Sequence, residues 1–353
     1  MRVGRSKLSP PTQLGMCCLE RIPSGDYGDA MKFVELPGLT RVSRLGLGTW
    51  QFGSREWGYG DSYAEGEAGR ILDRALELGV TLIDTAEAYG FGRSERIVGA
   101  ALAGRRDEAY VATKYFPIAP VPGLVERHGR GSAKRLEVET IDLYQVHQPN
   151  PIIPDRLVMG GMRSLQDAGV VADVGVSNYS LGRWQAAQNA LGRRVLSNQV
   201  RYSLVDRSAE AELLPWARDN DQLIIAWSPL AQGFLSARYD ADHRPAGTVR
   251  RANSLFLPEN LRLAKPLFGV LGEVADAHEA TPAQVALAWL LHQPNVLVIP
   301  GASTVEQLER NVQAADLELA TEEVGALRAA AEAFHPVGGL TAIPQMVTNW
   351  RAG

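Results

Sequence analysis

Four residues whose side chains can move protons follow successive apolar runs in the first half of the chain. Asp84 ends a short apolar run, and Tyr89 follows it five residues later. Lys114 and His147 each come directly after another apolar run. A tyrosine hydroxyl has a reference pKa of about 10, so it is a weak acid at neutral pH unless a nearby cation favours the phenolate. Together these four side chains suit the reduction of a carbonyl group.

In carbonyl reduction a hydride reaches the carbon and a proton must reach the oxygen. We predict that Tyr89 donates the proton, that Lys114 lowers the pKa of Tyr89, and that Asp84 orients Lys114 as its counter-ion. His147 can donate a hydrogen bond to the same oxygen and stabilise the charge that develops there. Each residue alone has an ordinary structural explanation, such as a helix cap or a packed core side chain. Their recurrence at successive strand ends indicates catalysis.

The apolar runs belong to a repeated pattern, in which a short run is followed by a longer amphipathic stretch. This alternation is typical of parallel strands separated by helices. We predict eight strands, at residues 45–48, 81–84, 110–113, 141–146, 173–176, 196–199, 223–226 and 296–299. Helices are expected to include residues 68–78, 94–102, 155–168, 181–190, 209–219 and 282–292. After the third strand, Gly129 and Gly131 predict a short or broken helix, because an interior glycine costs about 1 kcal/mol.

Eight strand and helix units close into a single (β/α)₈ barrel more readily than they extend an open sheet. A hairpin over residues 33–42, with a turn at Pro37 and Gly38, is expected to cover the N-terminal end of this barrel. Active sites of such barrels lie at the C-terminal ends of the strands. Long loops at that end, above all residues 228–295, are expected to bind ligands.

The composition is that of a globular protein, with 45% apolar and 22% charged residues in a chain of 353. The 36 basic and 40 acidic residues give a formal net charge of −4, which provides no large positive field for nucleic acid or an anionic membrane. No stretch is long and apolar enough to cross a bilayer. We therefore expect a cytoplasmic protein that has neither nucleic acid nor membrane as a partner.

Residues 1–30 lack the periodicity of a helix or a strand. We predict a disordered leader or a misplaced start, with translation beginning at Met31, and a regulatory tail is the alternative. Residues 31–353 then form the barrel domain. Cys17 and Cys18 are adjacent within the leader, so no disulfide framework holds the barrel together.

Three local patterns do not support other kinds of site. Residues 90–95, GFGRSE, begin like a dinucleotide-binding motif but end in glutamate and do not directly follow a strand. Residues 175–179, GVSNY, begin like a nucleophile elbow but end in tyrosine. The six histidines show no paired ligand spacing, so no metal site is predicted.

The sequence resembles the aldo-keto reductase family in seven segments that occur in one colinear order. They are IDTAEAYGFGRSE (83–95), VATK (111–114), IDLYQVHQP (141–149), VGVSNYS (174–180), SNQVRYSL (197–204), WSPLAQG (227–233) and IPGASTVEQLERN (299–311). The resemblance implies a TIM barrel that binds NADP(H) in an extended form. It also implies a catalytic tetrad, matched here by Asp84, Tyr89, Lys114 and His147. The expected activity is NADPH-dependent reduction of a small aldehyde or ketone to an alcohol.

The resemblance further implies which residues contact the nicotinamide and the pyrophosphate. Ser177 and Asn178, with Gln199 alongside, resemble the ligands of the carboxamide group. Trp227 takes the place where the family usually stacks an aromatic ring, often tyrosine. The full set expected in this part of the site is Thr49, Trp50, Asp84, Ser177, Asn178, Gln199, Trp227, Ser228 and Leu230.

The adenosine end is expected between the last strand and the next helix, where backbone N–H groups favour a phosphate. Gly301, Ser303 and Gln307 are the candidates there, although Thr304 and Gln307 also fit a helix capping box. Asn311 resembles the family's adenine contact. Basic candidates for the 2′-phosphate and pyrophosphate are Arg238 and Arg251 in the long loop, and Arg310, which stands where related sequences often carry an acid.

Two other functions remain open at this point. The cofactor segment also resembles potassium-channel β subunits, which share the barrel and bind NADP(H), so a nucleotide-sensing auxiliary subunit is one alternative. A sugar or alcohol dehydrogenase that runs the same tetrad in the oxidative direction is the other. The intact tetrad favours an enzyme over a sensor, and the residues make no prediction of natural substrate or oligomeric state.

Overall fold

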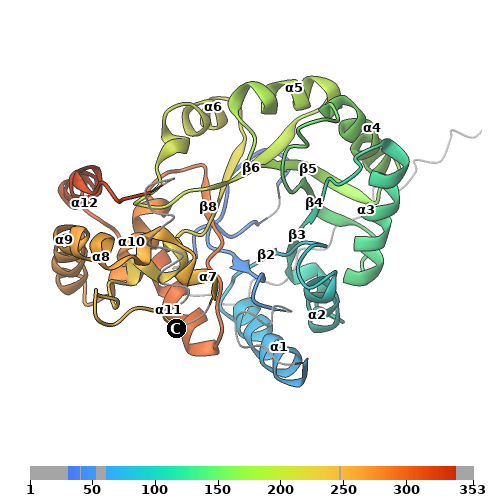
Figure 1. Cartoon of the computed structure of the whole chain (residues 1–353). Helices are drawn as coiled ribbons and strands as arrows, with labels where there is room; N and C mark the ends of the chain where they lie inside the picture. Colours follow the sequence, from blue (N-terminus) through green and yellow to red (C-terminus); the bar gives the residue numbers. More distant parts are fainter. Residues whose placement is uncertain (1–30, 40, 53–60, 246–247, 339–353) are drawn as a thin grey trace, which may run out of the picture.

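The computed structural model describes residues 31–39, 41–52, 61–245 and 248–338. Eight parallel strands form one curled sheet, and each strand lies beside its neighbours in the sequence (Figure 1). Two parallel bridges, Leu45 to Val298 and Gly48 to Gly301, join the two ends of the sheet. The predicted single (β/α)₈ barrel is confirmed. Its strands are β1 (Leu47–Gly48), β2 (Leu82–Asp84), β3 (Tyr110–Tyr115), β4 (Ile141–Val146), β5 (Val171–Ser177), β6 (Val195–Arg201), β7 (Leu223–Trp227) and β8 (Val296–Val298).

Arg44 reinforces the closure of the barrel from a position just before β1. Its guanidinium Nη2 donates a hydrogen bond of 2.6 Å to the backbone carbonyl of Leu291. It also donates to the carbonyls of Gln293 and Val296, which lead into β8. One side chain therefore satisfies several backbone groups at the join between the first and the last strand.

Helices surround the barrel because each connecting stretch carries an apolar stripe that packs on the strands. The outer ring in Figure 1 includes α1 (Asp61–Glu77), α2 (Arg93–Ala101), α3 (Pro122–Leu136), α4 (Asp155–Asp167), α5 (Leu181–Leu191) and α6 (Leu213–Asp219). Short 3₁₀ turns precede β3 and α6, at η2 (Arg106–Glu108) and η3 (Ser208–Glu210). The sixth helix therefore starts later than residue 209, where the sequence pattern placed its beginning.

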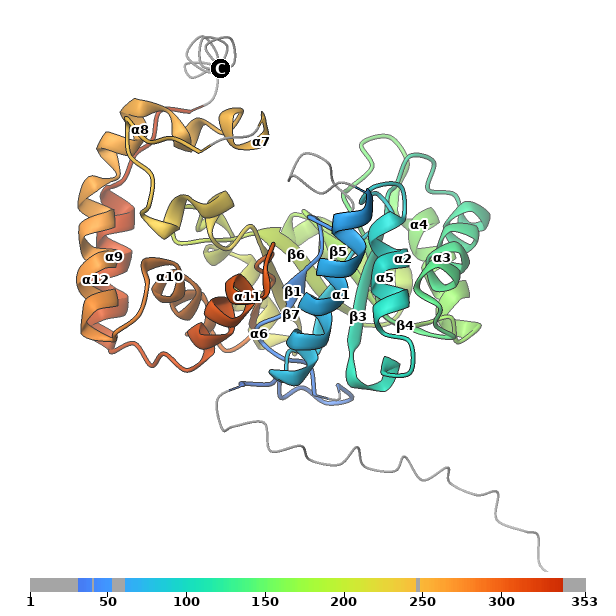
Figure 2. The same cartoon turned by 90° about the horizontal axis from the view of Figure 1, so that it is seen from below.

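The stretch between β7 and β8 contains additional helices, as its length predicts. They are η4 (Ala231–Ser236), α7 (Thr248–Arg251), η5 (Ser254–Phe256), α8 (Pro258–Leu263), α9 (Lys265–Ala277) and α10 (Pro282–Leu291). After β8 follow α11 (Val305–Val312), η6 (Gln313–Ala315) and α12 (Thr321–Ala333). Figure 2 shows α9 and α12 side by side, away from α1 to α5. This stretch supplies loops and helices at the edge of the barrel.

Two apolar cores follow from the alternation of side chains along the strands. In β4, Tyr144 and Val146 belong to the core between strands and helices, while Leu143 belongs to the core inside the barrel. Val34 and Val42 join this inner core, and the backbone N–H of Val34 donates to the carbonyl of Val42 at 2.8 Å. The predicted hairpin is therefore present as a short antiparallel contact against the barrel interior.

Helix α3 is continuous from Pro122 to Leu136, so the prediction of a short or broken helix was wrong. Gly129 is buried in it, and a Cβ at this position would lie only 2.5 Å from Leu165 Cδ1 of α4. The glycine allows α3 and α4 to pack closely. Tertiary packing of this kind outweighs the weak helix propensity of one residue.

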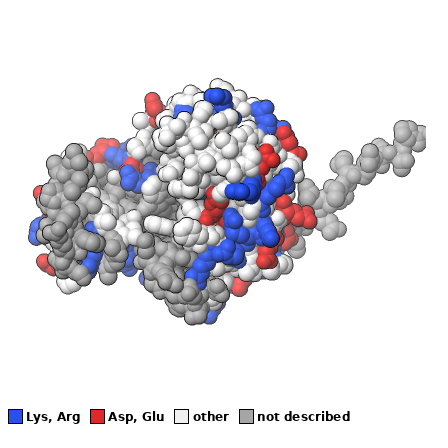
Figure 3. Space-filling model, turned by 45° about the vertical axis from the view of Figure 1, so that its right-hand side comes forward, with Lys and Arg blue, Asp and Glu red and all other residues white. Residues whose placement is uncertain are grey.

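The face that carries α2 and α3 has charges of both signs. Lys and Arg side chains form a band there, with Asp and Glu side chains bordering it (Figure 3). This face therefore does not present an extended field of one sign. Among the described residues, no helix has the length and apolar character needed to cross a membrane.

Candidate active site

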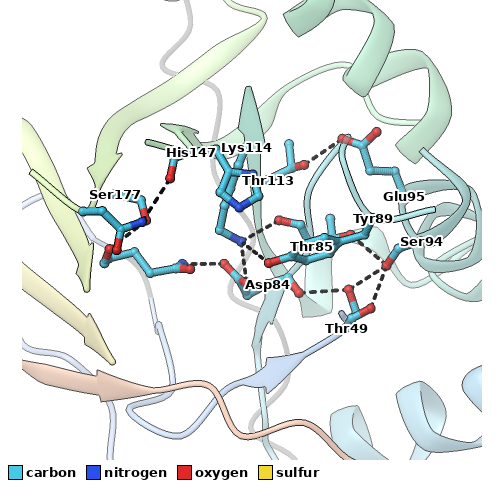
Figure 4. A network of polar contacts seen from close by, with 12 residues as sticks. Thr49, Asp84, Thr85, Tyr89, Ser94, Glu95, Thr113, Lys114, His147 and Ser177 are labelled. Carbon is cyan, nitrogen blue, oxygen red and sulfur yellow. Dashed lines mark hydrogen bonds and ion pairs between the residues drawn. The ribbon is translucent and has the colours of Figure 1, made fainter. Parts of the chain in front are cut away.

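The four residues expected to carry the chemistry lie together at the C-terminal end of the barrel (Figure 4). Asp84 ends β2, Tyr89 lies in the loop before α2, Lys114 lies in β3, and His147 directly follows β4. The Lys114 ammonium is 2.6 Å from Asp84 Oδ1 and 3.5 Å from the Tyr89 hydroxyl oxygen. The rings of Tyr89 and His147 meet edge to face, with their centroids 5.8 Å apart. Residues from three neighbouring strands thus form one cluster.

Hydroxyl groups fix the loop that carries Tyr89. Thr49 donates to the backbone carbonyl of Asp84 at 2.9 Å, and Ser94 donates to the carbonyl of Thr49 at 3.0 Å. The hydroxyl of Thr85 donates to Ser94 Oγ at 2.9 Å. All of these side chains are buried. Thr49, which sequence reasoning assigned to the cofactor, therefore lies beneath the site and braces the loop.

Lys114 is fully buried, and its charge is balanced by neighbouring oxygens. Burial is the largest single effect on the pKa of Lys114 and lowers it, but the charges and hydrogen bonds of Asp84 and Tyr89 together raise it by more, so the net pKa lies above the ordinary value. The ammonium also donates to the Thr85 carbonyl at 2.8 Å. The second oxygen of Asp84 accepts a 2.7 Å hydrogen bond from Gln199 Nε2. Asp84 therefore holds Lys114 and Gln199 in fixed positions.

Burial also determines the protonation of Tyr89 and His147. Burial raises the pKa of Tyr89, and the opposing effect of the Lys114 charge offsets this only in part. The pKa of Tyr89 is therefore raised, whereas the sequence predicted that Lys114 would lower it. The difference arises because the burial of the hydroxyl could not be known from the sequence. Burial, together with the charge of Lys114, lowers the pKa of His147 to about 3. At neutral pH the site therefore presents a neutral phenol and a neutral imidazole beside one ammonium.

A cavity of about 720 Å³ opens beside this cluster. Tyr89 and His147 line it, whereas Lys114 lies behind them and Arg251 lies outside the lining. The lining contains these expected cofactor residues: Trp50, Asp84, Ser177, Asn178, Gln199, Trp227, Ser228, Leu230, Arg238, Gly301, Ser303, Gln307 and Asn311. The barrel thus brings together side chains from every part of the expected site.

Asn178 is the centre of a second hydrogen-bonded group on the cavity wall. It has a left-handed backbone with a φ of 60°, and its amide nitrogen donates to the His147 carbonyl at 3.2 Å. The indole Nε1 of Trp227 donates to Asn178 Oδ1 at 3.1 Å. Ser177 donates to the Gln199 carbonyl at 2.7 Å. The bonds to His147 and Trp227 fix the orientation of the Asn178 amide, with its nitrogen toward His147 and its oxygen toward Trp227.

The segment after β8 contributes backbone groups and a helix start. Gln307 Oε1 accepts from the backbone N–H of Ser303 at 2.8 Å, and Thr304 caps α11 by accepting from the Gln307 N–H. Gly301 leaves no space for a Cβ, which would overlap the side-chain amide of Gln51. The capping explanation of Thr304 is thus realised, and Ser303 and Gln307 still line the cavity.

Arg250 is a lining residue that sequence reasoning missed, since it named the adjacent Arg251 instead. Which of two adjacent arginines faces a cavity depends on the rotation of the short helix α7, and no sequence pattern reports this rotation. Arg310 lines the cavity as well, although related sequences suggested an acid at its position. Other polar lining residues that were not predicted are Gln51, Gln148, Gln232, Ser236, Thr281 and Gln284.

Comparisons with known proteins identify relatives of the whole barrel. The family model described as Aldo/keto reductase family matches residues 44–332. An uncharacterized oxidoreductase of Mycobacterium tuberculosis is 55% identical over 307 residues, which cover 87% of this chain and 95% of the relative.

Two solved structures share the fold. An aldo-keto reductase from Klebsiella pneumoniae in complex with NADPH has a TM-score of 0.70 and 29% identity, over 85% of this chain and 94% of that one. The glycerol dehydrogenase AKR11B4 from Gluconobacter oxydans has a TM-score of 0.78 and 28% identity, over 87% and 97%. By family model, sequence identity and fold, the chain belongs to the aldo/keto reductase family.

Proposed function

We propose that this protein is an oxidoreductase that uses NADPH to reduce aldehyde or ketone carbonyls to alcohols, with Tyr89 as the proton donor. The observation that carries the proposal is the Tyr89 hydroxyl, which lines the cavity 3.5 Å from the buried Lys114 ammonium. A phenol so placed can give its proton to a substrate oxygen while the ammonium stabilises the phenolate that forms.

The charges of the cavity lining suit a cofactor with several phosphates. Arg238, Arg250 and Arg310 line the cavity, and Asp84 is the sole carboxylate among the described lining residues. The Asp84 charge is matched by Lys114. An anionic group in the cavity would therefore meet the positive charge of these arginines. The NADPH complex of the related Klebsiella pneumoniae enzyme supports the same assignment.

Each part of the cofactor then has candidate partners in the lining. Asn178, Gln199 and Ser177 would hold the carboxamide, and the Trp227 ring would stack on the nicotinamide. Leu230 and Ser228 would contact the pyrophosphate through the backbone, and Asn311 the adenine. The arginines that line the cavity replace Arg251 as candidates for the 2′-phosphate.

When bound, the reduced nicotinamide supplies a hydride to the carbonyl carbon. The chain's own residues handle the oxygen. Tyr89 stays protonated at neutral pH and donates its proton, and Lys114 stabilises the resulting phenolate. The neutral His147 can donate one hydrogen bond to the same oxygen. Its Nδ1 is buried without a partner among the described residues, which leaves Nε2 to meet a substrate.

The first test is a turnover assay that follows NADPH absorbance with a panel of aldehydes, ketones and sugars. Tyr89→Phe keeps the ring and removes the proton, so we expect kcat to fall by roughly 10²–10⁴-fold. The dissociation constant for NADPH should stay unchanged, because the hydroxyl acts on the substrate. Near-normal turnover by this variant would refute Tyr89 as the proton donor.

Oxidation of an alcohol is the second candidate function. The related glycerol dehydrogenase from Gluconobacter oxydans favours it, and the same four residues serve the reverse reaction. Assays with NADP⁺ and a panel of polyols measure this direction. If the chain binds NADPH tightly but turns over neither carbonyls nor alcohols, the result would instead favour the nucleotide-sensing alternative.

A further inference from the structure

Glu87 lies between Asp84 and Tyr89 in the loop after β2, but it does not line the cavity. Only 11% of its side chain is exposed. One carboxylate oxygen accepts from the backbone N–H of Phe116 at 2.7 Å, and the other lies 2.7 Å from His128 Nδ1. Its own backbone N–H donates to the Lys114 carbonyl at 3.3 Å. Glu87 therefore ties two active-site loops to each other and to α3.

The bond to Phe116 fixes a side chain that does line the cavity. The ring of Phe116 meets His147 edge to face, with centroids 5.7 Å apart and planes at 85°. His147 in turn meets Tyr89 in the same manner. Phe116 and Tyr89 thus contact the imidazole from two loops, and both loops are joined at Glu87.

Helix α3 provides the support behind Glu87. His128 and Arg135 stand seven residues apart, which is two turns, so they share one face of the helix. Arg135 Nη2 lies 3.8 Å from Glu87, and Arg135 Nε donates to the buried Glu95 at 2.6 Å. Glu95 accepts from Thr113, the residue before Lys114, at 2.7 Å. The helix that was expected to be broken is thus the part that fixes these carboxylates.

We propose that Glu87 is a positioning residue for the carbonyl substrate. By holding the backbone of Phe116, it keeps this ring against His147 and so sets the shape of the substrate side of the cavity. It contacts neither the cavity nor the cluster of Lys114 and Tyr89 side chains, so it acts through Phe116. This proposal rests on the proposed reductase function for its kinetic test.

The test compares Glu87→Ala, Glu87→Gln and a control, Glu108→Ala. Glu108 is also partly buried and pairs with Arg105 at 2.8 Å, but it lies before β3, at the other end of the strand from the site. In Glu87→Ala we expect KM for the carbonyl to rise about tenfold, with a smaller loss of kcat and an unchanged NADPH dissociation constant. Glu87→Gln keeps an acceptor for the Phe116 N–H, so its KM should return close to the parent value.

A second readout does not depend on catalysis. Amide hydrogen exchange at Phe116 should become at least about tenfold faster in Glu87→Ala and stay slow in Glu87→Gln and Glu108→Ala. If exchange follows this pattern but the parent chain reduces no carbonyl, the proposed function fails while the anchoring of Phe116 stands.

Three results would overturn the positioning role. One is an unchanged KM and unchanged Phe116 exchange in folded Glu87→Ala. Another is a rise in KM for Glu108→Ala equal to that for Glu87→Ala, since it would indicate a general loss of stability. The third is a KM in Glu87→Gln as high as in Glu87→Ala, which would mean that the bond to Phe116 does not carry the effect.

Discussion

At the level of single residues, Trp227 provides both an aromatic ring at the cavity and an indole N–H that donates a hydrogen bond. Its ring lines the cavity, with the guanidinium of Arg201 5.8 Å from the ring centroid. Its indole N–H fixes the amide of Asn178, which also donates to the carbonyl of His147. The aromatic surface and the orientation of the Asn178 amide, which we propose as a contact of the nicotinamide carboxamide, therefore depend on one side chain.

Replacing Trp227 by phenylalanine separates these properties, because the variant keeps an aromatic face and loses the N–H. A hydrogen bond of this kind contributes about 1 kcal/mol, so we expect the NADPH dissociation constant to rise about fivefold. Fluorescence titration with NADPH measures this. Trp216→Phe is the matched control, since Trp216 packs on Trp184 away from the cavity and its loss should leave affinity unchanged.

The lowered pKa of His147 should make the folding stability of the protein depend on pH. This folded pKa of about 3 lies below the ordinary value of 6.5, so the unfolded chain binds a proton that the folded chain does not. Stability should therefore fall as the pH decreases from about 6.5 toward 3, by at most about 1.4 kcal/mol per unit. Urea unfolding at pH 7 and pH 5 should show a larger loss in the parent than in His147→Gln. Equal losses would contradict this account.

At the scale of secondary structure, α3 and α4 show why propensity alone misjudges a helix. Gly129 is unfavourable for an isolated helix, yet it is what allows α3 to approach Leu165 and the ring of Tyr144. This approach also brings His128 and Arg135 within reach of Glu87. A pattern of residues along one segment contains no information about the surface on which that segment packs.

Gly129→Ala should therefore destabilise the protein although alanine is the better helix former. The added Cβ would lie 2.5 Å from a carbon of the fully buried Leu165, and overpacking costs about 1–3 kcal/mol against a gain of about 1 from propensity. Gly123→Ala in the same helix meets no atom within 4 Å and should be neutral or stabilising. Urea unfolding midpoints test both, and a stabilised Gly129→Ala would contradict the packing argument.

The strands and the clustering of Asp84, Tyr89, Lys114 and His147 could be predicted because each depends on short-range patterns. An apolar run such as residues 141–146 marks a buried strand, and the polar residue that follows it lies at the strand's C-terminal end. The direction of the Tyr89 pKa, the choice between Arg250 and Arg251, and the anchor at Glu87 could not be predicted. Each depends on burial or on contacts between segments that are distant in the sequence.

At the scale of the whole molecule, net charge and local charge differ in sign. The chain has a formal charge of −4, but Arg238, Arg250 and Arg310 from three separate segments gather around one cavity. Low-dielectric walls strengthen the field of such a group on a ligand. The fold therefore concentrates positive charge where an anionic cofactor would bind.

We expect this concentration to favour NADPH over NADH. Loss of a charged hydrogen bond to the 2′-phosphate costs about 1.5–3 kcal/mol. At least one of the variants Arg238→Ala, Arg250→Ala and Arg310→Ala should therefore raise the dissociation constant for NADPH roughly 10–100-fold and change that for NADH little. Arg251→Ala is the matched control, because Arg251 lies outside the cavity lining. Calorimetric titration with both cofactors measures this, and equal dissociation constants in the parent would contradict the preference.

The join between the first and last strands also has a consequence for folding. Arg44 and Leu291 meet there and are separated by 247 positions in the sequence. Forming their contact closes one of the longest loops in the chain, and the entropic cost of closing it is correspondingly large. Gly301, Ser303 and Gln307 lie directly after the last strand, and the pocket they line also contains Trp50 from beside the first. A nascent chain therefore has no complete dinucleotide pocket until nearly all of it has been synthesised. Once the pocket has formed, we expect bound nucleotide to stabilise the closed barrel by mass action, so that the protein's resistance to unfolding rises with the supply of cofactor.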